Sequence, residues 1–354
     1  MKKLKLSNFR KKHVIRDEAP ARITNETVAE YREQVLAGGR RFKYPHQYLR
    51  HKLVINAVLV SVVTLILLSI FGWWQLYSMQ NTSNFFYRLT RIVPVPVASV
   101  DGRQVRFSDY LMTLSGSKHY LEQTEKLDTA SADGKRQLEY IKGQALNDAI
   151  ASTYAAGLAE KHNITVTDKE VDAVINSSLT TVSGKISKEV YDSSTLSTLG
   201  YSPDEYRHII KASLLRQAVA YEVDESASAA KKAAEKIRKD MPAVGLSKVA
   251  SELKKKGYDV QVGASGLVPK SNHDGGLTQA AGALKVGAIS EFIKSNTGDG
   301  YYLVQLASKN DTQLSYNFLR ITLTQFSKQL KELEQNNKIQ RYISVQKTAE
   351  IKRK

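Results

Sequence analysis

The chain has 354 residues, of which 42% are hydrophobic and 25% charged, a composition typical of a folded protein with more than one unit. It contains no cysteine, which excludes disulfides, thiol catalysis, cysteine–zinc sites and a lipid-modified cysteine anchor. The formal net charge of +17 is uneven, because residues 1–52 carry 14 Lys and Arg against 5 Asp and Glu. This excess directly precedes an apolar run, so membrane topology explains it better than nucleic-acid binding.

The N-terminal 52 residues are expected to form a basic cytoplasmic tail that is mostly disordered and close to anionic lipid. One helix is predicted there, from Asn25 as N-cap to Leu36, with Gly38-Gly39 as its stop. The seven histidines of the chain are scattered and form no H-x-x-x-H pair, so no metal site is expected.

A single transmembrane helix is predicted at residues 53–77. These 25 residues carry no charge and would span roughly 37 Å as a helix, enough for a hydrocarbon core of about 30 Å. Trp73, Trp74 and Tyr77 at the far end are typical of an aromatic belt. The apolar run is too long and too far from the N-terminus for a cleaved signal peptide. It is therefore interpreted as an anchor.

The orientation follows from the basic residues that flank the apolar run. The N-terminal side has five of them within twenty residues, at Arg40, Arg41, Lys43, Arg50 and Lys52, whereas the far side has only Arg88 and Arg91. The positive-inside rule then predicts a cytoplasmic N-terminus and an extracytoplasmic C-terminal domain in the plasma membrane.

Local signals in the outer part predict first a β-hairpin and then a series of helices. Two strand-like runs flank Asp101-Gly102, and Ser108 is expected to cap the next helix. A long helix is predicted over 133–161, and two more begin at the capping boxes Thr167–Glu170 and Ser202–Glu205. Beyond residue 226 two helices, a strand at 258–262, a short helix through Leu284, a hairpin over 286–309 and a further strand are expected. A last amphipathic helix then covers 324–350.

Several of these segments resemble known families. VASVDGRQVRFSDY (97–110), NITVTDKEVDAVI (163–175) and SPDEYRHII (202–210) are similar to the SurA-type N-terminal chaperone domain. Residues 229–308, and above all LKVGAISEFIKSNTGDGYYLVQL (284–306), resemble a parvulin-type (PpiC-like) peptidyl-prolyl isomerase. The resemblance implies an α+β chain of the bacterial cell envelope, with a helical domain, an inserted parvulin-like module and a closing helix that packs back. The predicted parts are 1–52, the tail; 53–77, the anchor; 78–96, a juxtamembrane linker; 97–225, the helical domain; 226–310, the module; and 311–354, a strand and the closing helix.

The module departs from the parvulin pattern at the positions that carry catalysis. Where that family ends on glycine-tyrosine-histidine, this chain has Gly300-Tyr301-Tyr302, and AVAYEVDES (218–226) replaces the first strand with its histidine. No catalytic residue is predicted. The candidates for substrate binding within the module are Phe292 and Tyr302, and Tyr302 can equally be a packed strand aromatic.

The leading functional hypothesis is a membrane-anchored chaperone or foldase that binds unfolded or secreted polypeptides through apolar surfaces, without cofactor, metal or nucleic acid. An active peptidyl-prolyl isomerase and a non-catalytic envelope scaffold remain as alternatives. The residues expected to form the core and the client cradle together are Leu111, Leu114, Ile141, Ile150, Val171, Ile175, Ile209 and Leu214.

Overall fold

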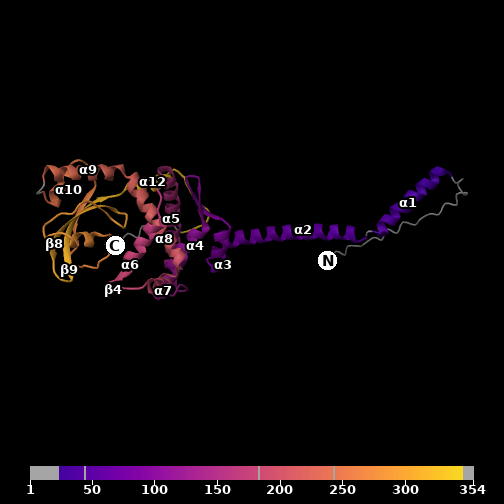
Figure 1. The fold of residues 1–354 in the computed structure, drawn as a ribbon, viewed down its shortest axis with the longest axis horizontal. Coiled ribbons are helices and arrows are strands. Elements are labelled where there is room, and N and C mark those ends of the chain that lie inside the picture. Colours follow the sequence, from indigo (N-terminus) through magenta and orange to yellow (C-terminus); the bar gives the residue numbers. More distant parts are fainter. Residues whose placement is uncertain (1–23, 44, 182–183, 242–243, 346–354) are drawn as a thin grey trace. The chain divides into compact units, whose positions relative to one another are not determined.

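The computed structural model describes residues 24–43, 45–181, 184–241 and 244–345, and the chain divides into two compact units, 1–73 and 74–354 (Figure 1). In the first unit, helix α1 (Asn25–Lys43) precedes helix α2 (Pro45–Trp73). The predicted stop at Gly38-Gly39 is wrong, because the helix continues to Lys43; Gly38 keeps a helical conformation and not the left-handed one that ends helices. Asn25 is the first helical residue and not the cap. The rest of the predicted tail, 1–23, lies outside the described residues.

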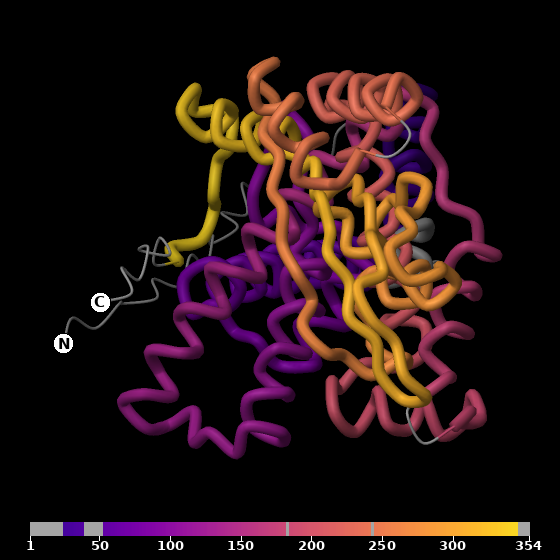
Figure 2. Tube along the Cα trace, turned by 90° about the vertical axis from the view of Figure 1, so that its left-hand side faces the viewer, coloured from indigo at the N-terminus to yellow at the C-terminus, as the bar shows by residue number. Residues whose placement is uncertain are grey.

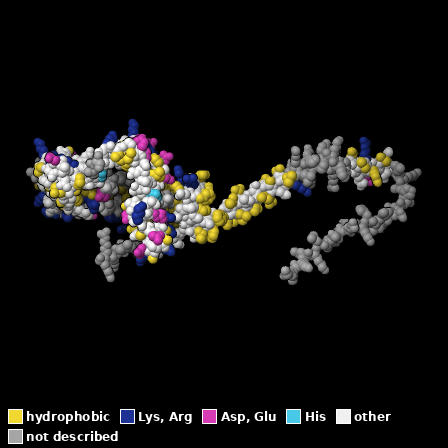
Figure 3. Space-filling view, turned by 90° about the horizontal axis from the view of Figure 1, so that it is seen from below, with side chains coloured by type: hydrophobic (Ala, Val, Ile, Leu, Met, Phe, Trp, Pro, Cys, Tyr) yellow, Lys and Arg dark blue, Asp and Glu magenta, His cyan; other side chains and the backbone are white. Residues whose placement is uncertain are grey.

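Helix α2 carries the apolar run. The segment Lys52–Ser78 is long and apolar enough to cross a membrane, and the 18 residues of its most apolar window are all exposed to the outside of the protein. Figure 3 shows the hydrophobic side chains that cover the helix. After Trp73 the helix gives way to a π-helical turn, Trp74–Ser78.

The second unit begins with a helical region built around a small sheet. Its elements are α3 (Asn84–Ile92), β1 (Pro96–Val100), β2 (Arg103–Arg106), α4 (Phe107–Gln123), α5 (Ala132–His162), α6 (Asp168–Ser178), β3 (Thr180–Thr181), β4 (Gly184–Lys185), α7 (Lys188–Leu199) and α8 (Pro203–Val223). The hairpin β1–β2 forms around Asp101-Gly102 as predicted, with positive φ at both turn residues. Both predicted capping boxes are confirmed.

One local prediction in this region is wrong. Helix α4 begins at Phe107 with Arg106 as N-cap, so Ser108 lies inside the first turn, where it is buried. The segment predicted as a juxtamembrane linker, 78–96, contains α3, whose Phe86 is buried in the core together with Leu76.

The core of the helical region fills the space between the hairpin and α4 and α5. Phe107, Tyr110 and Leu114 from α4 pack there against Leu146 from α5 and Val97 from β1, all at most 1% exposed. Apolar residues at helical spacing on α4 and α5 therefore serve mainly to hold these elements together.

An α+β module follows. It contains α9 (Glu225–Asp240), α10 (Leu246–Lys255), β5 (Val260–Ala264), β6 (Val268–Pro269), α11 (Leu277–Gly282), β7 (Ile293–Lys294), β8 (Gly300–Lys309) and β9 (Gln313–Thr322). The antiparallel sheet has the order β5-β9-β8-β7, with β6 also paired to β9; Figure 2 shows the long strands β8 and β9 side by side. Because strand side chains alternate, Leu303 packs towards α9 and α10, whereas Val304 packs towards α11.

The C-terminal segment returns to the helical region. Helix α12 (Gln325–Gln335) contacts α5 through Tyr154, whose hydroxyl donates to Gln329 Oε1 at 3.1 Å, and strand β10 (Ile339–Arg341) pairs with β1. The prediction of one helix over 324–350 is therefore wrong beyond Gln335; Asn337, with φ of 55°, turns the chain, and Ile339 lies in a strand. Residues 346–354 lie outside the described part of the chain.

Candidate functional site

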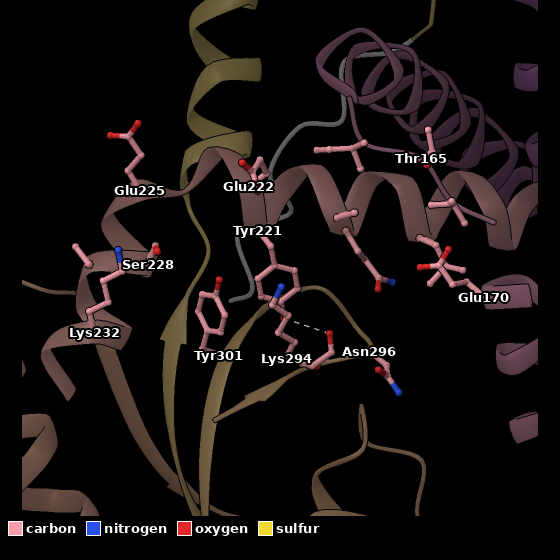
Figure 4. Close-up of a pocket in the computed structure, with 17 residues that line it drawn as sticks. Thr165, Glu170, Tyr221, Glu222, Glu225, Ser228, Lys232, Lys294, Asn296 and Tyr301 are labelled. Carbon is pink, nitrogen blue, oxygen red and sulfur yellow. Dashed lines mark hydrogen bonds between the residues drawn. The ribbon is translucent and has the colours of Figure 1, made fainter. Parts of the chain in front are cut away.

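A groove of about 700 Å³ lies between the helical region and the module, within the second unit (Figure 4). Four segments contribute to it: the stretch from Ile164 to Glu170 before and into α6, the C-terminal half of α8, the start of α9, and the β7–β8 hairpin. Its lining residues are Ile164, Thr165, Val166, Glu170, Leu214, Gln217, Ala218, Tyr221, Glu222, Glu225, Ser228, Ala229, Lys232, Lys294, Ser295, Asn296 and Tyr301. A cavity of this volume is in the range that binds ligands in proteins, about 300–1,000 Å³.

Helix α8 supplies one continuous stripe of the wall. Leu214, Gln217, Ala218, Tyr221 and Glu222 line the groove, and positions three, four, seven and eight apart lie on one face of a helix. The opposite side of the same helix packs into the helical region through Val219, which is fully buried. One helix thus serves both as a core element and as the wall of the groove.

Tyr221 joins α8 to the hairpin. Its hydroxyl donates to the carbonyl oxygen of Gly300 at 2.6 Å and lies 3.2 Å from that of Ser295, and its ring meets the Tyr301 ring edge to face, with centroids 5.0 Å apart. The Lys294 ammonium lies 5.3 Å from the Tyr221 ring centroid, within reach of a cation–π contact. Burial raises the pKa of the Tyr221 hydroxyl, so this group remains a neutral donor at physiological pH.

The groove is amphipathic and carries charges of both signs. Glu170, Glu222 and Glu225 line it together with Lys232 and Lys294. Glu170 also completes the α6 capping box, and the bonds from the backbone N–H and hydroxyl of Thr167 lower the pKa of its carboxyl. No histidine lines the groove, and within the described residues no three His, Asp or Glu side chains are grouped as metal ligands.

The structure does not bring the two predicted candidates for substrate binding together. Phe292 packs on the α9–α10 side of the sheet, with the Lys231 ammonium 5.8 Å from its ring centroid, whereas Tyr302 packs on the α11 side. Neither residue lines the groove.

Tyr302 is held in a polar cluster of its own. Its hydroxyl donates to Asp299 Oδ2 at 2.5 Å, and Arg320 Nη1 of the neighbouring strand donates to the same oxygen at 3.1 Å. Burial and the bond to Asp299 raise the pKa of Tyr302 to about 12. The side chain is 6% exposed, so it behaves as a packed strand aromatic.

Of the eight residues predicted to form core and cradle, one lines the groove: Leu214. Five others are buried core residues, namely Leu111, Leu114, Ile150, Val171 and Ile175. Ile141 and Ile209 are partly buried. Sequence reasoning missed Tyr221 and Tyr301. The helical spacing of Tyr221 from Leu214 and Ala218 could have identified the first of them, and strand alternation could have placed Tyr301 opposite Tyr302.

Comparison with known proteins supports part of the resemblance. Residues 47–220 match the family model of the SurA-like N-terminal domain. The match includes the apolar helix α2 and the elements from α3 to most of α8, and ends just before Tyr221, so the module lies beyond it. At the level of the family it indicates a chaperone-type function, which implies binding of unfolded polypeptides. No curated protein matches the chain.

Proposed function

We propose that this protein is a membrane-anchored extracytoplasmic chaperone that holds unfolded polypeptide segments in the groove between α8 and the β7–β8 hairpin. The observation that carries the proposal is the position of this groove: one of its walls is the last helix of the region that matches the SurA-like domain. A chaperone of this type needs an open, adaptable surface and no cofactor or energy source.

The chemistry of the groove suits an extended, unfolded chain. Leu214, Tyr221 and Tyr301 offer apolar and aromatic contact, while Gln217 and Asn296 offer amide groups that can pair with a peptide backbone. Because charges of both signs line the groove, neither acidic nor basic clients are strongly disfavoured. Shape-tolerant contact of this kind gives weak binding of many sequences.

The anchor is supported by the 27-residue apolar segment Lys52–Ser78 and by the basic residues before it. The family match starts at residue 47, in the first turn of α2 and before the apolar segment, which agrees with an anchor and a domain that occur together. An anchored chaperone meets its clients as they leave the membrane, which raises their local concentration without any new contact.

We further propose that the module is a parvulin-like fold without isomerase activity. The parvulin family has a histidine-bearing strand before its first helix, whereas residues 218–223 of this chain belong to α8. The strand between β5 and β8 in the sheet is instead β9, which follows β8 in the sequence. The position of the final histidine holds Tyr302, whose hydroxyl is engaged by Asp299. Prolyl isomerisation has a barrier of about 18–20 kcal/mol and needs a shaped, desolvated pocket. The full chain should therefore show no turnover above background in a protease-coupled proline-peptide assay, and a rate like that of active parvulins would contradict this proposal.

The client site is tested with the full chain in lipid nanodiscs and an aggregating, unrelated unfolded protein. The wild type should slow aggregation at near-stoichiometric ratios. Ala229→Arg should weaken this effect several-fold, because Ala229 is an exposed groove residue on α9 where a long side chain fits without disturbing the core. Ser226→Arg is the matched control, since Ser226 is exposed on the same helix and does not line the groove.

Each outcome has a distinct meaning. If both variants act like the wild type, the groove is not the client site. If the wild type has no effect on aggregation but captures one folded envelope protein, the chaperone proposal is wrong and the scaffold alternative is correct.

A further inference from the structure

Helix α3 presents two different faces. Phe86 and Thr90, four residues apart, are buried against the helical region. Phe85, Arg88 and Ile92 lie on the other side, at spacings of three and four, and are exposed. The exposed fractions are 68% for Phe85 and 82% for Ile92. An outward face of this composition is apolar and basic at once.

Such exposure is unusual for a face that meets only water. Ile92 is the most exposed large hydrophobic side chain among the described residues. Met79, 58% exposed, precedes the helix by five residues, and Val93, 49% exposed, directly follows it. Contiguous exposed apolar groups rimmed by polar ones mark sites that contact a membrane or a partner.

The short link between the apolar segment and α3 indicates that a membrane, and not a protein partner, covers the exposed face of α3. The apolar segment ends at Ser78, and only five residues separate it from Asn84, so a fully extended link would reach at most roughly 20 Å. The link is not extended. The Met79 N–H donates to the Trp74 carbonyl oxygen at 3.1 Å, and the Asn81 N–H to that of Gln75 at 2.9 Å. These bonds draw the start of α3 back towards the end of the apolar segment.

We propose that α3 lies on the outer surface of the bilayer, with Phe85 and Ile92 inserted at the level of the headgroups and Arg88 facing lipid phosphates. The proposal rests on the membrane anchor proposed above. Arg91, whose side chain is 56% exposed, adds a second positive charge, although it also lies 3.9 Å from Glu205. Aromatic, aliphatic and arginine side chains on one face are the composition that binds membrane interfaces, and anionic lipid strengthens the attachment.

The consequence is a defined orientation of the folded domain. A single spanning helix alone leaves the domain free to tilt on its tether. A second contact through α3, which is packed on the core by Phe86, fixes the helical region against the bilayer and hence the side from which clients enter the groove.

The absence of cysteine makes the test direct, because single cysteines can be introduced and spin-labelled without background. The variants are Phe85→Cys and Ile92→Cys of the full chain, reconstituted at low density in phosphatidylcholine vesicles containing phosphatidylglycerol. Paramagnetic accessibility to oxygen and to a water-soluble nickel chelate is compared at each site. Leu267→Cys is the matched control, since Leu267 is an exposed leucine (65%) in the module, and Val63→Cys reports on the anchor.

We expect oxygen to be favoured over nickel several-fold more at 85 and 92 than at 267, with a further rise when the phosphatidylglycerol content increases. Water-like accessibility at 85 and 92 overturns the α3 proposal if position 63 is lipid-like. Water-like accessibility at 63 instead overturns the anchor itself. Spin–spin broadening at 85 or 92 that persists on dilution in lipid shows that a second copy covers the face, and this also overturns the proposal.

Discussion

At the scale of single residues, Asp224 holds together the two points where the chain passes between the helical region and the module. Its Oδ1 accepts the N–H of Ala227 at 2.9 Å and caps α9. Its Oδ2 accepts the N–H groups of Thr324 at 2.6 Å and Gln325 at 3.0 Å, where α12 begins. The residue is 1% exposed, and three backbone donors offset the cost of burying its charge.

Replacing this carboxylate should destabilise the fold. Asp224→Ala leaves three donors without their acceptor and should lower the free energy of unfolding by about 3 kcal/mol, since a lost cap and unsatisfied buried groups both contribute. Asp224→Asn keeps one acceptor oxygen and should lose less. Urea unfolding of the full chain in detergent gives the measurement, with exposed Asp240→Ala as control. Equal urea midpoints for Asp224→Ala and the control would show that the Asp224 carboxylate does not stabilise the fold.

The carboxyl group of Asp274 should make the stability of the module depend on pH in the acidic range. Burial alone would raise the pKa of its carboxyl, but hydrogen bonds from Thr278, Tyr316 and Asn272 outweigh burial and lower the pKa. A carboxyl whose pKa is lower in the folded state stabilises the fold. This stabilisation is complete at a pH above the pKa of the unfolded state, about 3.9, and is lost as the pH falls through the pKa of the folded state.

The unfolding free energy should thus decline below about pH 4, and Asp274→Asn should reduce this slope. The slope is measured from urea midpoints at a series of acidic pH values. Asp259→Asn, an exposed position, should keep the wild-type slope. An unchanged slope in the Asp274 variant would exclude this carboxylate as the source.

At the scale of elements, the sequence predicted what is decided locally. The capping boxes at Thr167 and Ser202 and the Asp101-Gly102 turn need only a few neighbouring residues, and all three form. Strand β10 was missed because it is fixed by β1, far away in the sequence. Ile339 lies six residues after Leu333, outside the three- and four-residue spacing of Phe326, Leu330 and Leu333, so the helical periodicity already ends before it. The Asn336-Asn337 pair, a common helix end, was a second available signal.

The segment after β10 should be needed for stability. Ile343 is 5% exposed in the core of the helical region, so Ile343→Ala should lower the free energy of unfolding by about 3 kcal/mol through lost contacts and a cavity. Ser344→Ala is the control: its side chain is exposed, and the backbone carbonyl that accepts from Gln80 is kept. Thermal unfolding of both variants tests this prediction. Equal transition temperatures would show that Ile343 does not belong to the cooperatively folded core.

At the scale of the whole molecule, the candidate site could not be predicted, because its walls come from segments around residues 166, 218, 229 and 295 that only folding brings together. Apolar periodicity identified core residues such as Leu114 and Val171, since most apolar residues on a helix serve packing. The resemblance of the helical region, in contrast, rested on local motifs, and the family match over 47–220 supports it.

The basic residues that flank the apolar run determine the membrane topology of the whole chain. Five basic residues within 40–52 precede the apolar run, whereas only Arg88 and Arg91 lie within twenty residues of its other end, so the N-terminus should stay in the cytoplasm. A reporter that is active only outside the cytoplasm should work after Lys354 and fail before Leu53. Changing the five basic residues to Glu should give a mixture of the two orientations, because the positive charge that keeps this flank on the cytoplasmic side is then lost. The same change at five lysines of the module should leave the orientation unchanged. Activity of the N-terminal fusion alone would reverse the topology and place the groove in the cytoplasm.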